Sequence, residues 1–452
     1  MASYVYLAFQ PDLRLAVPEM LGVTAVVLIM LTMVLYAGKK GSVGWSPGII
    51  ILIAFILRLL FLCRAPELSD DIYRYLWDGL QTVTGHNPYA LAPFHMKPHS
   101  EVTAYLLKHM NHPDFVTIYP PFAQLIFAAG AALTHSLSGL KAMLVMLDLA
   151  TCFMIIKILS SMNLTVWRAS LYAWHPLPVL EIAGSGHVDG AGILFFFITV
   201  SLLFLREETN NTEQYTKTND LLFFERPLSK LIAGLAFSAA VLVKLIPLIY
   251  LPVLLIAITG SGSVLFVIGF LSGLTLLIVP FLPDLYNMTL TLSMYLYNWE
   301  FSNFAFRRLR DFYSSGSAAR MVLLIICSIA ISALSVYFLM KKRKSKAGNT
   351  FSVFMQTIYG VTISFLLLTP TLHPWYALYL AVLLPFAAGV AGLILSWTIF
   401  LSYHVQIKYT LLGQWIESDL IAAVIWLAPV LAFVIRMIIR RLFRKQVILT
   451  EI

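Results

Sequence analysis

Long apolar runs recur along almost the whole of this 452-residue chain, and they constrain its fold more than any other feature. Runs of about 17 to 25 residues are long enough to cross a bilayer as helices. Hydrophobic residues make up 60% of the chain and charged residues only 12%, whereas soluble domains contain about 25% charged residues. The sequence therefore predicts an all-α, polytopic membrane protein in which residues 1–452 form a single integral-membrane domain.

The apolar segments predict about 12 to 13 transmembrane helices. Two of the segments, 229–258 and 375–411, are long enough for two helices each. The remaining segments lie near 18–38, 48–63, 120–135, 140–160, 166–183, 188–205, 264–282, 319–340, 352–369 and 419–438.

Basic residues give the expected orientation, because short cytoplasmic loops are enriched in Lys and Arg. They gather at the ends of apolar runs, so the net charge of +9 reflects topology and no nucleic-acid partner is expected. We expect Lys39, Lys40, residues 341–346 and a cytoplasmic tail at 439–452 to lie inside. An outer catalytic loop at 64–119, a second outer loop at 283–318 and the 370–376 turn then lie outside.

The stretch RASLYAWHPLPVLEIAGSGHVDG, residues 168–190, does not suit a regular spanning helix. Pro176 and Pro178 remove backbone donors and clash with the preceding turn. If 64–119 is outside and 206–230 is cytoplasmic, the four apolar segments between them must also cross an odd number of times. We therefore expect a broken or re-entrant pair, which a membrane tolerates only where the backbone is buried in protein or lines a wet cavity.

Two adjacent carboxylates, Asp70 and Asp71, follow the apolar segment near 48–63 in the sequence SDDIYRYLWDG. One interpretation is an interfacial helix whose acids pair with Arg74. The other is that one carboxylate acts as the general base that removes a proton from an acceptor hydroxyl. Asp70 follows Ser69 and suits a helix start, which favours Asp71 as the base.

Further ionisable residues lie within or beside apolar segments, where they usually face a cavity or the protein interior. Glu181, His187 and Asp189 lie in the broken segment, and we expect them to line the same outer-facing cavity as Asp71. His187 and Asp189 are too few ligands to indicate a metal, and Asp189 also suits a helix cap. Lys244 interrupts an apolar run, where it suits either a turn that snorkels to water or contact with an anionic lipid head group.

Two later stretches are polar and aromatic. YLYNWEFSNFAFRRLRDF contains Glu300 among aromatic, amide and arginine side chains, which suit either sugar and phosphate recognition or an amphipathic interfacial helix. In TPTLHPWYALYL, we expect the ring of His373 to lie at the outer surface beside Trp375.

Taken together and in order, six motifs resemble the integral-membrane GT-C superfamily of glycosyltransferases, in particular the bacterial polyprenyl-phosphate-mannose-dependent mannosyltransferases. The motifs span about 64–385 and read SDDIYRYLWDG, GHNPYALAP, TIYPPFAQLIFA, HPLPVLEIAGSGHVDG, VKLIPLIYLP and LHPWY. Two features depart from the family pattern. An extra span precedes the one leading into the acidic loop, and the acids are adjacent, whereas some branches have a spaced DxD.

The resemblance implies transfer of one hexose, mannose by analogy, from a polyprenyl-phosphate donor to a lipid or glycan acceptor. It implies a multi-pass protein of a cell membrane, here a bacterial inner membrane, with its active site on the outer face and Asp71 or Asp70 as base. No cofactor is indicated, and the adjacent acids leave a divalent metal unsupported. The expected substrate-binding residues are Arg74, Tyr119, Glu181, His187, Asp189, Lys244, Glu300, His373, Trp375 and Tyr376.

A secondary transporter or lipid flippase is the alternative, because such proteins also use broken helices and buried ionisable groups. Transporters often have paired halves and ionisable groups near the bilayer midplane. In this chain the charged candidates collect in outer loops on one side, which favours an interfacial enzyme.

Overall fold

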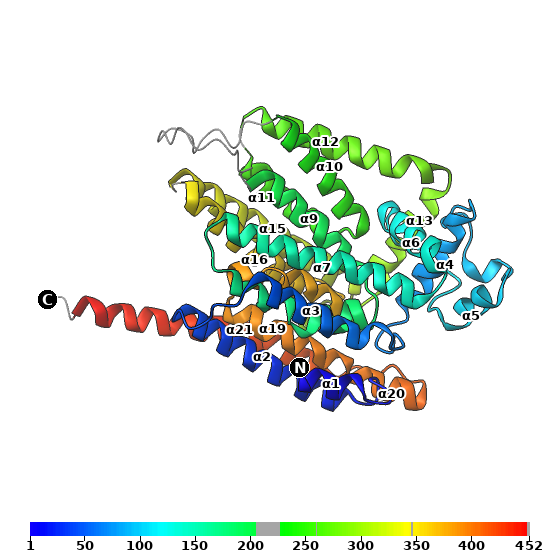
Figure 1. Cartoon of the computed structure of the whole chain (residues 1–452), viewed down its shortest axis with the longest axis horizontal. Helices are drawn as coiled ribbons and strands as arrows, with labels where there is room; N and C mark the ends of the chain where they lie inside the picture. Colours follow the sequence, from blue (N-terminus) through cyan, green and yellow to red (C-terminus); the bar gives the residue numbers. More distant parts are fainter. Residues whose placement is uncertain (205–226, 259, 345–346, 450–452) are drawn as a thin grey trace.

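A computed structural model describes residues 1–204, 227–258, 260–344 and 347–449 of the chain. In this described part, long helices run side by side, and α4, α5, α6 and α13 gather at one end of the bundle (Figure 1). Most of the predicted loop at 206–230 lies outside the described residues, as do positions 345–346 of the basic run and the last three residues of the tail.

The first half of the chain forms nine α-helices within the described residues. Serine N-caps begin two of the long ones, since Ser46 accepts a hydrogen bond from the Ile49 amide and Ser136 accepts one from the Gly139 amide. The helices are α1 (Ala2–Ala8), α2 (Val17–Lys39), α3 (Pro47–Leu62), α4 (Asp71–Val83), α5 (Glu101–His109), α6 (Pro121–Thr134), α7 (Leu137–Ser161), α8 (Ser170–Ala173) and α9 (Asp189–Phe204).

The second half of the described chain is also helical, with one isolated β-bridge between Phe301 and Thr371. The predicted tail continues α21 as a helix as far as Leu449. The helices are α10 (Pro227–Val243), α11 (Leu251–Ala257), α12 (Gly262–Ile278), α13 (Leu285–Asn298), α14 (Phe304–Tyr313), α15 (Gly316–Lys344), α16 (Ala347–Leu368), α17 (Leu378–Ala381), α18 (Leu384–Ala387), α19 (Val390–Thr398), α20 (His404–Leu412) and α21 (Asp419–Leu449).

Within the described residues, seven helices are long and apolar enough to cross a membrane, or up to eight if one bent pair counts as a span. This supports the all-α, multi-pass membrane architecture, but by length and composition it gives fewer spans than the 12 to 13 expected. One candidate span covers Gly262–Asn298, in which the 3-10 segment Val279–Asp284 joins α12 to α13, so helical structure extends into the region predicted as the second outer loop.

The expected breaks in the apolar segments are largely found. The helical turns Pro178–Gly184 and Asp189–Phe204 meet at 118°, which confirms the predicted broken segment. Lys244 lies between α10 and α11, as the turn interpretation required. The 375–411 segment, however, divides into four helical pieces where two were expected, because Pro385 and Gly389 interrupt it between α17 and α19.

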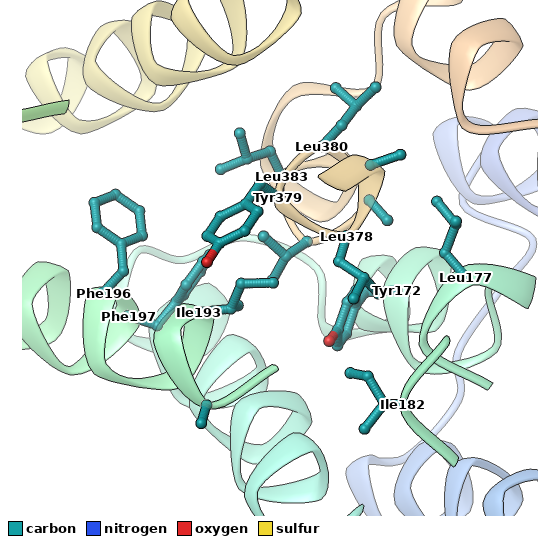
Figure 2. Packing of buried hydrophobic residues seen from close by; sticks show 14 of the residues in the cluster. Tyr172, Leu177, Ile182, Ile193, Phe196, Phe197, Leu378, Tyr379, Leu380 and Leu383 are labelled. Atoms are coloured by element: carbon teal, nitrogen blue, oxygen red, sulfur yellow. The ribbon is translucent and has the colours of Figure 1, made fainter. Parts of the chain in front are cut away.

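The broken segment packs into the apolar core. Figure 2 shows Leu177 and Ile182 of this segment, Ile193 and Phe197 of α9, and residues of α17 in one buried cluster. Leu177, Ile182 and Phe197 are wholly buried. Because both sides of the break are anchored in this core, the polar residues between them have fixed positions.

Candidate functional site

One end of the bundle brings together polar residues from five parts of the chain. They come from the start of α4, the segment before α6, the break before α9, the turn between α10 and α11, and the turn before α17. Gly79 lets α4 lie directly against α6, since a side chain there would meet the Phe127 carbonyl at 2.3 Å. The residues of this cluster, which we call the polar cluster, are Asp71, Tyr119, Glu181, His187, Asp189, Lys244, Trp375 and Tyr376.

Asp71 is the partly accessible carboxylate of the polar cluster, with 17% of its side chain exposed. The Tyr119 hydroxyl donates to its Oδ2 at 2.9 Å, and the Asn111 amide donates to its Oδ1 at 3.2 Å. Tyr75 in turn donates to the Tyr119 hydroxyl at 3.2 Å. Such donors stabilise an ionised carboxylate. Tyr119 therefore joins the site as expected, through Asp71.

His187 lies next to Asp71, with its Nδ1 3.9 Å from Asp71 Oδ2. Its Nε2 lies 3.6 Å from Glu181 Oε2, and both His187 and Glu181 are wholly buried. The preceding Gly186 has φ +79°, and a side chain there would meet Ile72 at 2.3 Å, so only glycine suits this turn. The broken segment therefore lies beside Asp71, and the outer-facing cavity expected there stays a prediction.

Glu181 also binds a residue that the sequence analysis missed. The hydroxyl of Tyr403 lies 2.9 Å from both carboxylate oxygens of Glu181. The only sequence signal for Tyr403 is the polar run Ser-Tyr-His inside the apolar 375–411 segment. Asn111 was missed as well, since a lone amide in the loop at 64–119 has no distinguishing pattern.

Lys244 supplies the positive charge of the polar cluster. Its Nζ donates to Asp189 Oδ2 at 2.8 Å and lies 4.9 Å from the centre of the Tyr376 ring. The second oxygen of the buried Asp189 has no hydrogen-bond partner within the described chain. Tyr376 contacts Tyr295 of α13 through their hydroxyls, 3.1 Å apart. Lys244 therefore contacts both the carboxylate of Asp189 and the ring of Tyr376.

Four rings stack in series from the polar cluster outward. Trp375 stacks between His187, at 4.1 Å, and His373, at 4.2 Å, and His373 stacks on Phe301 at 4.8 Å. Both faces of Trp375 are therefore covered, so Trp375 has no free face on which a sugar ring could stack. His373 was expected at the outer surface, but it is half-buried within the stack. Burial, together with the charge of Lys244, lowers the pKa of His373 to about 3, so the ring is neutral.

Arg74 does not join the polar cluster. It was expected to bind substrate, and one interpretation paired it with Asp70 and Asp71. Instead, its Nε donates to Asp78 at 2.9 Å and its Nη2 to the Phe115 carbonyl. The i,i+4 spacing on α4 explains this pairing, because residues four apart share one face of a helix. Arg74 is largely buried there, so a direct contact with substrate is unsupported.

Asp70 forms no ion pair or hydrogen bond with His187 in the described structure. It occupies the N-cap position of α4, as expected from Ser69, although its side chain makes no capping hydrogen bond. Burial and the neighbouring charge of Asp71 raise the pKa of Asp70, against the opposing effects of Arg14 and His109. Of the two adjacent acids, Asp71 is therefore the one that enters the polar cluster.

Glu300 and the arginines near it form ion pairs with one another and with the start of α21. Glu300 pairs with Arg310, whereas Arg307 pairs with Glu417 and lies 2.6 Å from Asp419. These pairs tie α14 to α21 and leave the arginines engaged, which favours the interfacial-helix interpretation over contact with phosphate.

Among the described residues, no group of three or more His, Cys, Asp or Glu side chains is placed to hold a metal ion. No protein-family model matches the chain, and no curated protein matches it. The chemistry of the polar cluster must therefore be argued from its own residues.

Proposed function

We propose that this protein is a glycosyltransferase of the GT-C type that moves one hexose from a polyprenyl-phosphate donor to a lipid or glycan acceptor. Mannose is the sugar suggested by the resemblance of the six motifs. The reaction needs a base for the acceptor hydroxyl and a cation for the departing phosphate. A single displacement by that hydroxyl would invert the anomeric carbon.

The observation that carries this proposal is a partly exposed carboxylate and a lysine in one polar cluster. Asp71 contacts His187, His187 stacks on Trp375, and Lys244 lies 5.9 Å from the Trp375 ring. The Asp71 carboxylate would take the proton of the acceptor hydroxyl. Lys244 would neutralise the phosphate, while Glu181, His187, Asp189, Tyr119 and Tyr376 shape the site around them.

The number of membrane spans and the membrane side of the polar cluster belong to the same proposal. Seven spanning helices, the bent pair and four shorter apolar helices of 10–17 residues together make twelve, within the expected 12 to 13. We place the polar cluster on the outer face of the membrane, since Lys39, Lys40 and Lys341–Lys344 lie at the far ends of α2 and α15.

Membrane sidedness can be tested with single cysteines in a variant that lacks Cys63, Cys152 and Cys327. Lys97→Cys lies in the exposed part of the first outer loop, and Ser42→Cys lies in the exposed turn after α2. An impermeant maleimide added to intact cells should label only Lys97→Cys. Labelling of Ser42→Cys alone would reverse the orientation.

The decisive test of activity uses purified protein and a panel of radiolabelled polyprenyl-phosphate sugars with a membrane-lipid extract as acceptor. We expect product from one donor, and Asp71→Asn should lower transfer about 100-fold or more, because Asn keeps the size but cannot accept a proton. Asp71→Asn should elute and unfold like the unchanged protein. If Asp71→Asn and Asp70→Asn both retain transfer, the base must be another acid, such as Glu300 or Asp189.

A secondary transporter or lipid flippase remains the second candidate, and one observation favours it. The 118° break and the ion pair between Lys244 and Asp189 resemble the interrupted helices and buried charges of transporters. Proteoliposomes loaded with the labelled lipid would distinguish the two. Movement of intact lipid between leaflets without sugar transfer would favour the flippase.

A further inference from the structure

His187 is a buried imidazole in an unusual position. Its two ring nitrogens face carboxylates on opposite sides, 3.9 Å from Asp71 and 3.6 Å from Glu181, and neither has a hydrogen-bond partner within the described residues. The stack on Trp375 holds the plane of the ring. Buried polar groups are nearly always hydrogen-bonded. The question is therefore which of the three groups, Asp71, Glu181 and His187, carry protons when both carboxylates lie next to one imidazole.

The arrangement contains fewer donors than acceptors if both acids are ionised and His187 is neutral, the form that its complete burial favours. A neutral imidazole has one N–H and one bare nitrogen, so the bare nitrogen would face the oxygen of an anion. That clash of lone pairs disappears if one of the two acids carries a proton and donates it to the bare nitrogen.

Glu181 is the acid whose surroundings suit the protonated form. Its side chain is wholly buried and contacts the Tyr403 hydroxyl and His187, while the nearest lysine of the cluster, Lys244, bonds to Asp189. Burial of an unpaired carboxylate is costly. Asp71, in contrast, is partly exposed and receives hydrogen bonds from two neutral donors.

We propose that Glu181 is an uncharged carboxylic acid whose proton is directed at Nε2 of His187, 3.6 Å away, so that His187 carries its own proton on Nδ1 and directs it toward Asp71, 3.9 Å away. The other oxygen of Glu181 then accepts the Tyr403 hydroxyl. Glu181 and His187 are positioning residues, because they act through Asp71 by keeping it ionised and oriented. Their effect on catalysis rests on the proposed function. The assignment of one proton to Glu181 and one to Nδ1 of His187 does not.

Matched substitutions distinguish an uncharged Glu181 from an ionised one. Glu181→Gln keeps the shape and supplies an N–H donor, so transfer from radiolabelled polyprenyl-phosphate mannose should stay within about threefold of normal. Glu181→Leu removes the donor and frees the tautomer of His187, which should lower transfer about 100-fold. Equal losses in the two variants would show that Glu181 must be charged, and would overturn the proposal.

Substitutions of His187 distinguish the roles of its two ring nitrogens in the same way. His187→Asn places an amide near the position of Nδ1 and should retain more transfer than His187→Gln, whose amide lies near the position of Nε2.

The pH dependence of transfer is a further measurement. The rate of transfer should fall at a higher pH in Glu181→Leu than in the unchanged protein. The titratable groups that face His187 are Asp71, Glu181, Lys244 and His373, so a matched pH profile of Lys244→Arg is the control.

A spectroscopic experiment needs no sugar transfer. The infrared difference spectrum between the unchanged protein and Glu181→Gln at neutral pH should contain the C=O band of a protonated carboxylic acid. That band should persist but shift in Tyr403→Phe. Nitrogen NMR of histidine-labelled protein, assigned with His187→Asn, should find the proton of His187 on Nδ1.

These results separate the two proposals. A protonated Glu181 without transfer from any polyprenyl-phosphate sugar would remove the proposed function and leave the proton arrangement intact. Absence of the carboxylic-acid band, or a proton on Nε2 of His187, would overturn the arrangement even in an active transferase.

Discussion

Two of the buried ionic sites in the described part of the chain differ in the satisfaction of their hydrogen bonds. Arg58 of α3 and Asp148 of α7 pair at 2.6 Å with both side chains wholly buried. Arg58 also donates to the Ala173 carbonyl, and Tyr172 donates to the second oxygen of Asp148. In the polar cluster, by contrast, His187 and one oxygen of Asp189 have no partner in the described chain.

This difference indicates different roles for the two sites. A buried ion pair whose other polar atoms are bonded is complete and holds α3, α7 and the segment before the break together. A buried group without a partner costs free energy unless a water, an ion, a ligand or a reaction uses it. Asp71 and Lys244 of the polar cluster have side-chain exposures of 17% and 16%, whereas Arg58 and Asp148 have none.

The largest expected effect is on stability, at the satisfied site. Arg58→Met should lower the free energy of unfolding by about 3–5 kcal/mol, because Asp148 would remain as a buried and uncompensated charge. Thermal unfolding of the purified protein in detergent measures the loss. The double variant Arg58→Met with Asp148→Leu should recover most of it, and a double variant as unstable as Arg58→Met would contradict the role assigned to this pair.

Lys244→Met tests the unsatisfied site. Loss of the cation should cost about 2 kcal/mol, or about 30-fold in kcat/KM for the polyprenyl-phosphate donor, since the phosphate loses its charged partner. Lys244→Arg keeps the charge and is the matched control. A loss of thermal stability as large as that of Arg58→Met, with unchanged donor kinetics, would make Lys244 a structural residue.

A smaller effect is expected at Tyr119, which bonds to Asp71 at 2.9 Å. Tyr119→Phe removes one hydrogen bond to a carboxylate, worth about 1.5 kcal/mol, so transfer should fall about tenfold. Tyr75→Phe, one step further from Asp71, is the control and should change transfer less. A Tyr75→Phe effect equal to that of Tyr119→Phe would mean that the tyrosines act by packing alone.

The smallest effect concerns Asp70, beside the polar cluster but outside it. Because burial and Asp71 raise its pKa in the folded protein, the charged form of Asp70 is disfavoured at neutral pH. Asp70→Asn should therefore raise stability at pH 7 by less than about 1 kcal/mol. That gain should shrink as the pH falls through the raised pKa and vanish below the pKa of the unfolded chain. Melting temperatures of both proteins across this range measure it, and a gain that grows in acid would be the wrong sign.

Local sequence patterns predicted several parts of the site. Pro176 and Pro178 predicted the break, and Lys244 marked the turn between α10 and α11. Ser69 placed Asp70 at the helix start, so the choice of Asp71 followed from neighbouring residues. These features succeed because prolines, caps and charges in apolar runs act on the chain within a few residues.

Other expectations met contacts that the sequence does not reveal. One interpretation paired Arg74 with the adjacent acids, but its partner on the same helix face is Asp78. Trp375 was expected to bind substrate, yet both faces of its ring are stacked on histidines. Sequence proximity does not reveal which face of a ring or helix is already occupied.

Composition and the length of its apolar runs were enough to predict an all-helical, multi-pass membrane protein, because a backbone in lipid must satisfy its own hydrogen bonds. The tertiary structure alone decided that His187 lies between Asp71 and Glu181. It also brought Tyr403 to Glu181 from 222 residues away along the chain. Such contacts depend on how several helices pack at one end of the bundle, and no local pattern of residues encodes that packing.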